Sequence, residues 1–239
     1  MKIMYLARRP VPSVNANSVQ IVTMCEAMAK LGHEVTLVAQ PGDAPADTLF
    51  ERYGIQRSFS VRTLPDSGGG TLPKWRYLAE LRQLIRSEPA DLYFGRDIWS
   101  LRLVARSGKP LVYEAHVSPP GPTLRGRLLD QLLARPNFSH LVCVTTTLAD
   151  VYRKQYPQLA GKPVIVAPNA AADISKCAAP TAWPGREGRL QAGFVGRPYP
   201  GKGIEMIVEA AGRLPEVDFH IVGARRSAVG WVRMDIPGN

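Results

Sequence analysis

The chain has few cysteines and no long apolar run, and both shortages limit what it can be. Its 239 residues include three cysteines, Cys25, Cys143 and Cys177, which share no close spacing. They predict buried free thiols rather than a disulfide framework or a zinc site. No apolar run approaches the roughly 20 residues that a membrane-spanning helix requires. Arg8 and Arg9 interrupt the N-terminus too early for a signal peptide, which favours a cytoplasmic protein.

Acidic residues are scarce relative to basic ones. The sequence has 30 Lys and Arg against 20 Asp and Glu, a formal net charge of +10. This charge indicates an anionic partner, and nucleic acid, anionic lipid or a phosphate-bearing substrate would each satisfy it. We find no basic strand interleaved with aromatics, no helix-turn-helix signature and no zinc spacing, so a nucleic-acid partner is not expected.

Glycine is missing from the turn that follows the first expected strand. A dinucleotide-binding fingerprint requires G-x-G-x-x-G at this point, so this half of the chain is not predicted to bind a dinucleotide. Asn17 or Ser18 is expected to cap the first helix. Arg8, Arg9 and Asn15 then remain to face a ligand at the carboxyl edge of the sheet.

Apolar runs alternate with amphipathic segments of helical length through most of the chain. Runs that are apolar throughout are typical of strands covered on both faces. The alternation predicts an α/β fold with a doubly wound, Rossmann-like parallel sheet. The expected strands are Lys2–Ala7, Glu34–Ala39, Ser60–Leu64, Asp91–Phe94, Leu111–Ala115, Leu141–Thr145 and Val164–Ala167. The expected helices are Ser18–Leu31, Lys74–Ser87, Ile98–Ser107, Thr123–Ala134 and Leu148–Tyr156.

One stretch without periodicity divides the chain. Residues 169–188 are rich in Ala, Pro and Gly. We therefore expect a first Rossmann-like domain at 1–170, a linker at 171–188 and an incomplete second domain at 189–239. The second domain would hold one strand–helix–strand unit, made of Leu190–Val195, Gly203–Leu214 and Val217–Val222. Unpaired edges of so small a sheet predict self-association.

The turn between the first strand and the helix of that unit carries the strongest functional pattern. Arg197 and Lys202 stand there among Gly196, Gly201 and Gly203. Backbone N–H groups and the positive end of the helix dipole would face an anion, and the two side chains add full charges. A Walker A loop is excluded, because Gly203 stands where that loop requires Ser or Thr. The turn predicts a site for a phosphate group.

His116 is the most informative of the four histidines. It follows the expected strand Leu111–Ala115, at the sheet edge where such folds bind ligands. Glu114, two residues earlier, points to the same side if the strand period of two holds. Its carboxylate could orient the imidazole or pair with a nearby arginine, and the sequence leaves both open.

The helix expected at Lys74–Ser87 has an apolar face bordered by Trp75, Arg82 and Arg86. A basic border with an exposed Trp is typical of helices that lie on anionic membranes. The same pattern also describes the solvated edge of an ordinary packed helix. Peripheral contact with a membrane is therefore one of two open interpretations.

Taken together, these features resemble glycosyltransferase family 4, a group of retaining enzymes with the GT-B fold. The resemblance implies transfer of a sugar from a nucleotide-diphosphate sugar to a carbohydrate or lipid-linked acceptor. It implies no cofactor and no metal, and the sequence has no D-x-D cluster. The segments that carry it are 2–8, 15–18, 31–37, Tyr93–Arg96, Val112–His116, Val166–Asn169 with Asp173, Phe194–Arg197 and Gly201–Gly203.

The resemblance also implies roles for single residues. Arg197 and Lys202, with the three glycines around them, would hold the diphosphate of the donor. His116 would be catalytic, beside the sugar and the acceptor. The acceptor side would comprise Arg8, Asn15, Asn17, Arg96 and Glu114.

The chain departs from the family pattern in three places. Asn15-Ala16-Asn17 replaces the paired glycines of the first loop, and alanines at 170–172 stand where Gly-Val is usual. The carboxylates of the E-x7-E motif, which hold the donor's sugar and ribose, would lie beyond Val222 and are absent. We therefore expect a truncated enzyme. The alternative is a catalytically incomplete domain that binds its ligands without turnover.

Overall fold

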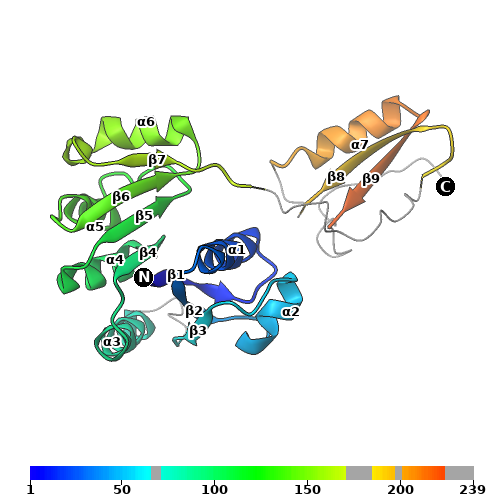
Figure 1. Ribbon diagram of the computed structural model, residues 1–239. Helices are drawn as coiled ribbons and strands as arrows, with labels where there is room; N and C mark the ends of the chain where they lie inside the picture. Colours follow the sequence, from blue (N-terminus) through cyan, green and yellow to red (C-terminus); the bar gives the residue numbers. More distant parts are fainter. Residues whose placement is uncertain (66–70, 171–184, 197–200, 224–239) are drawn as a thin grey trace. The chain divides into compact units, whose positions relative to one another are not determined.

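The computed structural model describes residues 1–65, 71–170, 185–196 and 201–223. The chain divides into two compact units, Met1–Ala171 and Ala172–Asn239 (Figure 1). Each unit is described by itself below. Most of the linker expected at 171–188 lies outside the described residues.

One parallel sheet of seven strands forms the centre of the first unit, in the order β3-β2-β1-β4-β5-β6-β7. The chain builds outward from β1 to β3 and then returns to build outward from β4 to β7 on the other side. This arrangement confirms the predicted doubly wound, Rossmann-like fold. The strands are β1 (Lys2–Val11), β2 (Glu34–Pro41), β3 (Ser60–Thr63), β4 (Leu92–Gly95), β5 (Leu111–Ala115), β6 (Phe138–Cys143) and β7 (Val164–Val166).

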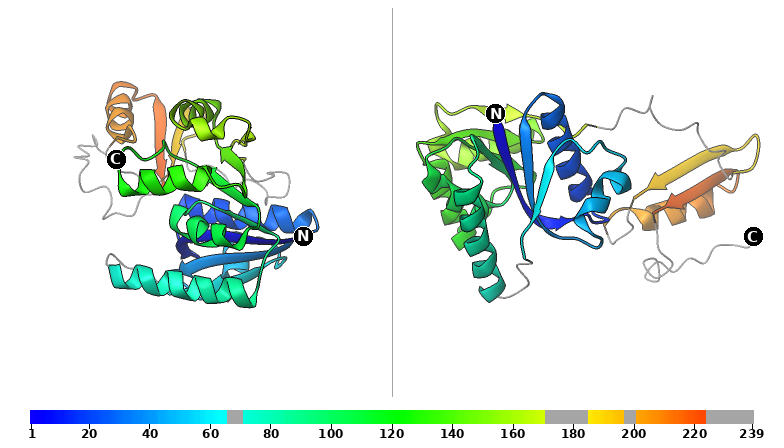
Figure 2. Two further views of the ribbon diagram at one scale, coloured as in Figure 1. Left: turned by 90° about the vertical axis from the view of Figure 1, so that its left-hand side faces the viewer. Right: turned by 60° about the horizontal axis from the view of Figure 1, so that its bottom comes forward.

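Helices cover both faces of this sheet (Figure 2). Residues of β1 alternate between the two core clusters, as the strand period of two requires. Met4 and Leu6 pack with α3 to α6, whereas Ile3 and Tyr5 pack with α1 and α2. The helices are α1 (Ala16–Lys30), α2 (Leu49–Tyr53), α3 (Thr71–Ser87), α4 (Ile98–Val104), α5 (Leu124–Leu133) and α6 (Thr146–Gln155), with 3₁₀ turns η1 (Ala46–Thr48), η2 (Ala105–Ser107) and η3 (Pro157–Leu159).

Two of the cysteines lie in these cores. Cys25 and Cys143 are buried and free, as the sequence predicts, and Cys177 lies outside the described residues. Burial raises the pKa of the Cys143 thiol to about 11. Both thiols therefore behave as small apolar core groups.

The chain departs from the prediction at the end of β1. The strand continues through Arg8 and Arg9 to Val11, so the prediction that these arginines lie in a turn is wrong. The register with β2 shifts between Leu6 and Pro10, where Arg8 has a φ of 40°. Pairing with β2 resumes beyond the shift and extends the strand, a tertiary effect that the local sequence does not contain.

The start of α1 is also displaced from its predicted place. Asn15 is the N-cap residue, so the prediction that Asn17 or Ser18 caps this helix is wrong. Ser18 is buried, and its hydroxyl lies 2.7 Å from the hydroxyl of Tyr53. A similar shift affects β6, which ends before Thr145, because the Thr145 hydroxyl accepts a bond from the N–H of Leu148 and caps α6.

The second unit contains one described strand–helix–strand unit. Its parallel strands are β8 (Leu190–Val195) and β9 (Val217–Val222), with α7 (Ile204–Arg213) between them. Both strands have the predicted bounds. Ile204 is the only buried hydrophobic residue in the described part of this unit.

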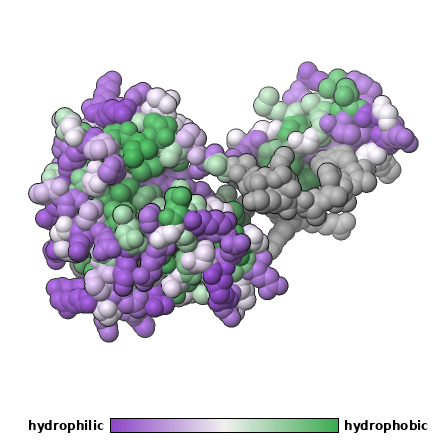
Figure 3. All heavy atoms as spheres, in the orientation of Figure 1, coloured by the Kyte–Doolittle hydropathy of each residue, from purple (hydrophilic) through white to green (hydrophobic). Residues whose placement is uncertain are grey.

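The surface of the first unit is largely polar on the face that Figure 3 shows, with apolar side chains gathered over the β6–β7 end. Ile165 and Val166 of the edge strand β7 are 46% and 37% exposed.

In the part of the chain that the structure describes, no helix is both long and apolar enough to cross a bilayer.

Candidate functional site

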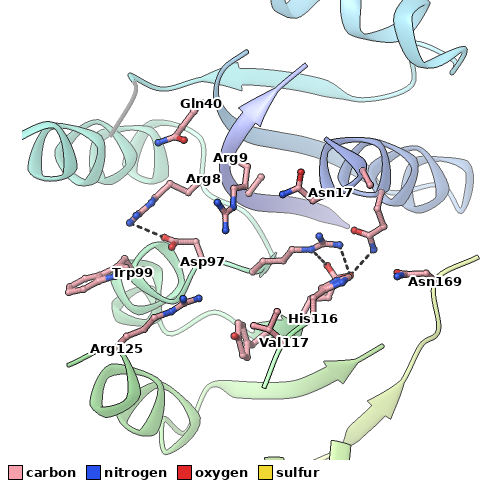
Figure 4. A pocket seen from close by; sticks show the side chains of 16 residues that line it. Arg8, Arg9, Asn17, Gln40, Asp97, Trp99, His116, Val117, Arg125 and Asn169 are labelled. Atoms are coloured by element: carbon pink, nitrogen blue, oxygen red, sulfur yellow. Dashed lines mark hydrogen bonds and ion pairs between the residues drawn. The ribbon is translucent and has the colours of Figure 1, made fainter. Parts of the chain in front are cut away.

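A cavity of about 580 Å³ lies in the first unit, at the carboxyl ends of β1, β4 and β5 (Figure 4). The strand order reverses between β1 and β4, and open α/β sheets bind their ligands at this point. The cavity brings together six residues that the sequence singled out: Arg8, Arg9, Asn17, Arg96, Glu114 and His116.

Glu114 is the centre of a hydrogen-bonded cluster in this cavity, and its side chain is 2% exposed. Arg96 donates from Nε to Oε2 at 3.0 Å and from Nη2 to Oε1 at 3.1 Å. The Nε2 of His116 lies 2.8 Å from Oε1. The Tyr5 hydroxyl donates to Oε2 at 2.6 Å, and Nε2 of Gln20 donates to Oε1 at 2.9 Å. Both alternatives that the sequence left open therefore occur together in what we call the Glu114 cluster.

The cluster favours the ionised form of Glu114 and the protonated form of Tyr5. Burial would raise the pKa of Glu114, but the hydrogen bonds from His116 and Arg96 lower it well below its ordinary value. The ionised carboxylate can only accept, so Nε2 of His116 donates to it. In the neutral imidazole, Nδ1 is then unprotonated. Burial and the Glu114 charge raise the pKa of Tyr5 well above its ordinary value, which keeps its hydroxyl a donor.

Local structure between β4 and α4 positions Arg96. A Cβ on Gly95 would lie 2.5 Å from the carbonyl oxygen of Leu6, so glycine is required where β4 approaches β1. Directly after Arg96, Asp97 caps α4 by accepting from the N–H of Ser100 at 2.8 Å. Arg96 is therefore held between a strand end and a helix start.

A second group of charged side chains lines the opposite end of the cavity (Figure 4). The Nη1 of Arg8 lies 3.6 Å from Oδ2 of Asp97, and the guanidinium carbon of Arg8 lies 5.9 Å from the centre of the Tyr77 ring. Arg9 and Arg125 point into the same space. We call Arg8, Arg9 and Arg125 the arginine group.

Other predicted residues lie elsewhere, and some cavity residues were not predicted. Asn15 is outside the cavity lining; it is exposed, and its amide donates to Oγ of Ser13 at 3.4 Å. Three residues of the cavity lining were not predicted: Asp97, Trp99 and Arg125. The Asp97 and Ser100 spacing is a helix-cap pattern that could have been found, whereas no local pattern marks Arg125.

The predicted phosphate turn lies in the second unit. Gly201 and Gly203 have φ values of 87° and 78°, and a Cβ on either would meet no atom of a described residue within 4 Å. Their backbone conformation, not a lack of space, therefore requires glycine. Gly203 is the N-cap of α7. Because glycine has no side chain, this residue cannot cap the helix through a side-chain hydrogen bond. Lys202 stands exposed directly before it, Gly196 follows β8, and Arg197 lies outside the described residues.

Within the described ranges, no group of three or more His, Cys, Asp or Glu side chains is placed to hold a metal ion. The clustered groups at the cavity are instead arginines, carboxylates and one imidazole. Such groups bind anions and hydroxyl-bearing ligands through hydrogen bonds.

A doubly wound sheet with a polar cavity at its switch point is the architecture of a Rossmann-like domain. The chain belongs to Glycosyltransferase Family 4, whose profile matches residues 18–172. Together with the structural matches below, this confirms the resemblance found in the sequence. A search of curated proteins gave no match.

Several solved structures have a similar fold. Anabaena Alr3699/HepE, crystallised with UDP and glucose, has 17% identity and a TM-score of 0.60 over 92% of this chain and 60% of its own. A glycosyltransferase from Rickettsia africae ESF-5 has 12% identity and a TM-score of 0.63 over 92% of this chain and 59% of its own. The glycotransferase of kitacinnamycin has 12% identity and a TM-score of 0.57 over 96% of this chain and 67% of its own. The chain thus spans about three fifths of the length of the first two.

Proposed function

We propose that the chain serves the transfer of a sugar from a nucleotide-diphosphate sugar to an acceptor bound in the cavity, with retention of anomeric configuration. The observation that carries this proposal is the Glu114 cluster at the sheet's switch point in a family 4 domain. The cluster presents an aligned imidazole where a substrate hydroxyl would sit. Retention follows from the family resemblance.

On the acceptor side, Glu114 holds His116 through its Nε2 at 2.8 Å. The opposite ring nitrogen, Nδ1, would accept a hydrogen bond from a hydroxyl of the sugar or the acceptor. Arg96, bound by two hydrogen bonds to the same carboxylate, keeps the arrangement rigid. Positioning of this kind lowers the barrier because the reacting groups are held before reaction.

On the donor side, Lys202 and Arg197 would hold the diphosphate at the N-terminus of α7, with Gly196, Gly201 and Gly203 shaping the turn. Negative charge gathers on the nucleotide diphosphate as the glycosidic bond breaks. A cation and unpaired helix N–H groups aimed at this charge stabilise the transition state more than the ground state. The similar Anabaena protein was crystallised with UDP, which supports a nucleotide partner. No cofactor and no metal enter this proposal.

Nucleotide binding tests the donor site. We expect the parent chain to bind UDP or GDP weakly in calorimetry with a panel of nucleoside diphosphates. Lys202→Ala should weaken that binding by about 2 kcal/mol, or roughly thirtyfold, because a charged contact to phosphate is lost. Lys109→Ala, which removes an exposed lysine of the first unit, is the matched control and should bind like the parent. Unchanged affinity in Lys202→Ala would contradict the donor-site assignment.

Turnover separates the enzyme from the binding-only alternative. Since the chain spans about three fifths of its structural relatives, we expect binding without sugar transfer by this chain alone. Release of UDP from UDP-glucose, with and without simple sugar acceptors, is the assay. Transfer or donor hydrolysis by the isolated chain would support a complete enzyme instead.

We also propose that α3 brings the first unit to an anionic membrane, where a lipid-linked acceptor would be found. Trp75 of α3 is 68% exposed. A crevice of about 310 Å³ between α3 and α4–η2 is lined by apolar side chains and by Arg82, Arg86 and Arg106. None of these three arginines makes an ion pair with a described residue. Apolar surface bordered by unpaired cations favours an anionic bilayer.

Vesicle binding tests this surface. The double substitution Arg82→Gln and Arg86→Gln should weaken binding to phosphatidylserine-containing vesicles by about 2 kcal/mol, because each basic residue near the surface contributes about 1 kcal/mol. Arg76→Gln is the control on the same helix, since Arg76 already pairs with Glu80 at 3.1 Å. Co-sedimentation measures both. Equal binding by the parent and the double variant would rule out this surface.

A further inference from the structure

The charges of the cavity do not balance. Four arginines and two carboxylates line it. One arginine is neutralised within the Glu114 cluster. The second carboxylate, Asp97, lies 3.6 Å from Arg8. For Arg9 and Arg125, no ion pair is found with any residue that the structure describes. Net positive charge therefore remains at the end of the cavity formed by the arginine group.

Arg8 is only partly satisfied by Asp97. The Oδ2 atom of Asp97 already accepts from the N–H of Ser100 at 2.8 Å and from its hydroxyl at 2.7 Å. The separation of 3.6 Å from Arg8 is too long for a hydrogen bond. The Nη1 atom of Arg8 is buried and has no hydrogen-bond partner among the residues that the structure describes. A buried donor without an acceptor costs free energy, which a ligand oxygen would recover.

One member of the arginine group, Arg8, is also organised before any ligand arrives. Arg8 has a φ of 40°, in the left-handed region that residues other than glycine seldom adopt. Strained backbone of this kind occurs at ligand-binding sites, where the surrounding structure holds it. The guanidinium lies over the ring of Tyr77, which limits its motion. Little conformational freedom is then lost when a ligand binds.

The two ends of the cavity differ in chemistry. The Glu114 cluster offers an imidazole to a hydroxyl, and the arginine group lines the other end of the same cavity, together with Asp97 and Trp99 (Figure 4). Guanidinium groups bind phosphate oxygens in pairs of parallel hydrogen bonds, and several of them suit a doubly charged phosphate better than a neutral sugar. A ligand that spans both ends would carry a hydroxyl at one end and an anion at the other.

We propose that the acceptor carries a phosphate ester and that Arg8, Arg9 and Arg125 bind this group while the acceptor hydroxyl faces His116. This inference rests on the proposed function and adds the chemical class of the acceptor. A sugar phosphate and a phospholipid headgroup share this chemistry.

Binding of a phosphate monoester tests the site. The probe is glucose 1-phosphate, compared with glucose, in calorimetry on the full chain. We expect the phosphate monoester to bind more tightly than glucose, and Arg9→Gln and Arg125→Gln each to weaken it about tenfold. Arg127→Gln is the matched control, because Arg127 is an exposed arginine two residues along α5 that does not line the cavity. It should bind like the parent. Both test residues are exposed, and thermal unfolding of each variant verifies its fold.

A competition experiment identifies whether the phosphate ester of the acceptor belongs to a sugar phosphate or to a phospholipid. Competition between glucose 1-phosphate and a short-chain phosphatidic acid ranks the two sources. Either ranking supports the site if Arg125→Gln weakens both ligands. No binding of glucose 1-phosphate by the parent, or equal binding by the parent and Arg125→Gln, would overturn the inference.

UDP binding by the same variants distinguishes a failure of this inference from a failure of the proposed function. If UDP binding falls in Arg125→Gln and not in Lys202→Ala, the arginine group serves the donor's diphosphate, and the inference is overturned. UDP binding that falls only in Lys202→Ala supports the donor site. If Arg125→Gln then binds glucose 1-phosphate like the parent, the acceptor phosphate site is overturned.

Discussion

Replacing Glu114 by Gln should lower the free energy of unfolding of the first unit by about 3 kcal/mol. The Glu114 carboxylate is almost fully buried and accepts hydrogen bonds from Arg96, His116, Tyr5 and Gln20. An amide keeps the shape but leaves the guanidinium without its counter-ion, and it turns an N–H toward groups that are themselves donors. Urea unfolding followed by circular dichroism measures the loss.

Two further variants calibrate this result. Tyr5→Phe removes one hydrogen bond of the cluster and should cost about 1 kcal/mol. Glu51→Gln changes an exposed carboxylate of α2 and should stay within about 0.5 kcal/mol of the parent. If Glu114→Gln unfolds like Glu51→Gln, the cluster does not stabilise the fold as its geometry indicates.

The same variant should alter how stability depends on pH. The folded pKa of Glu114 is lowered, so near the ordinary value of 4.5 the unfolded chain binds more protons than the folded one at this residue. Its contribution is therefore present above about pH 4.5 and is lost as the pH falls toward the folded pKa. The difference in unfolding free energy between parent and Glu114→Gln should shrink as the solution is acidified. If the unfolding free energies of the parent and Glu114→Gln differ by the same amount at every pH from 7 to 3, the lowered pKa of Glu114 is contradicted.

The arrangement of the sheet was predictable because its signal is local. Apolar runs of strand length indicate strands, and β5, β8 and β9 have the predicted bounds, although only β5 is buried along its whole length. The end of β1 was not predictable, because its two arginines and Pro10 are typical of a turn and only pairing with β2 keeps them in a strand. The five-residue helix α2 is too short to show a helical period.

The candidate site was predictable only in part, for a related reason. Glu114 lies near the end of β5 and His116 directly follows that strand, so the strand period predicts both at the sheet edge. Arg96 directly follows the neighbouring strand β4, and parallel strands bring their carboxyl ends together. Arg125 reaches the cavity from the start of α5. Its position depends on how the helices pack, and no spacing in the sequence records that.

Backbone amides of β8 and β9 should exchange with solvent about a thousandfold faster than those of β5, a gap of roughly 4 kcal/mol in opening free energy. The strand β5 is buried along its whole length between two helical layers. In the described part of the second unit, two strands and one helix bury a single hydrophobic residue, Ile204. A two-stranded sheet of this kind is marginally stable in water. Hydrogen exchange followed by mass spectrometry of peptides from both units measures the gap.

The exchange experiment is repeated at several protein concentrations. Pairing of β8 or β9 with another copy of the chain would also protect their amides from exchange. Leu190 and Val195 of β8 are 75% and 77% exposed, and apolar edge strands pair readily with other copies. Protection of β8 and β9 should then rise with concentration, while that of β5 stays constant. Equal protection of β5 and β8 at the lowest concentration would show that the second unit is stable by itself. Protection that does not change with concentration would exclude self-association through these edges.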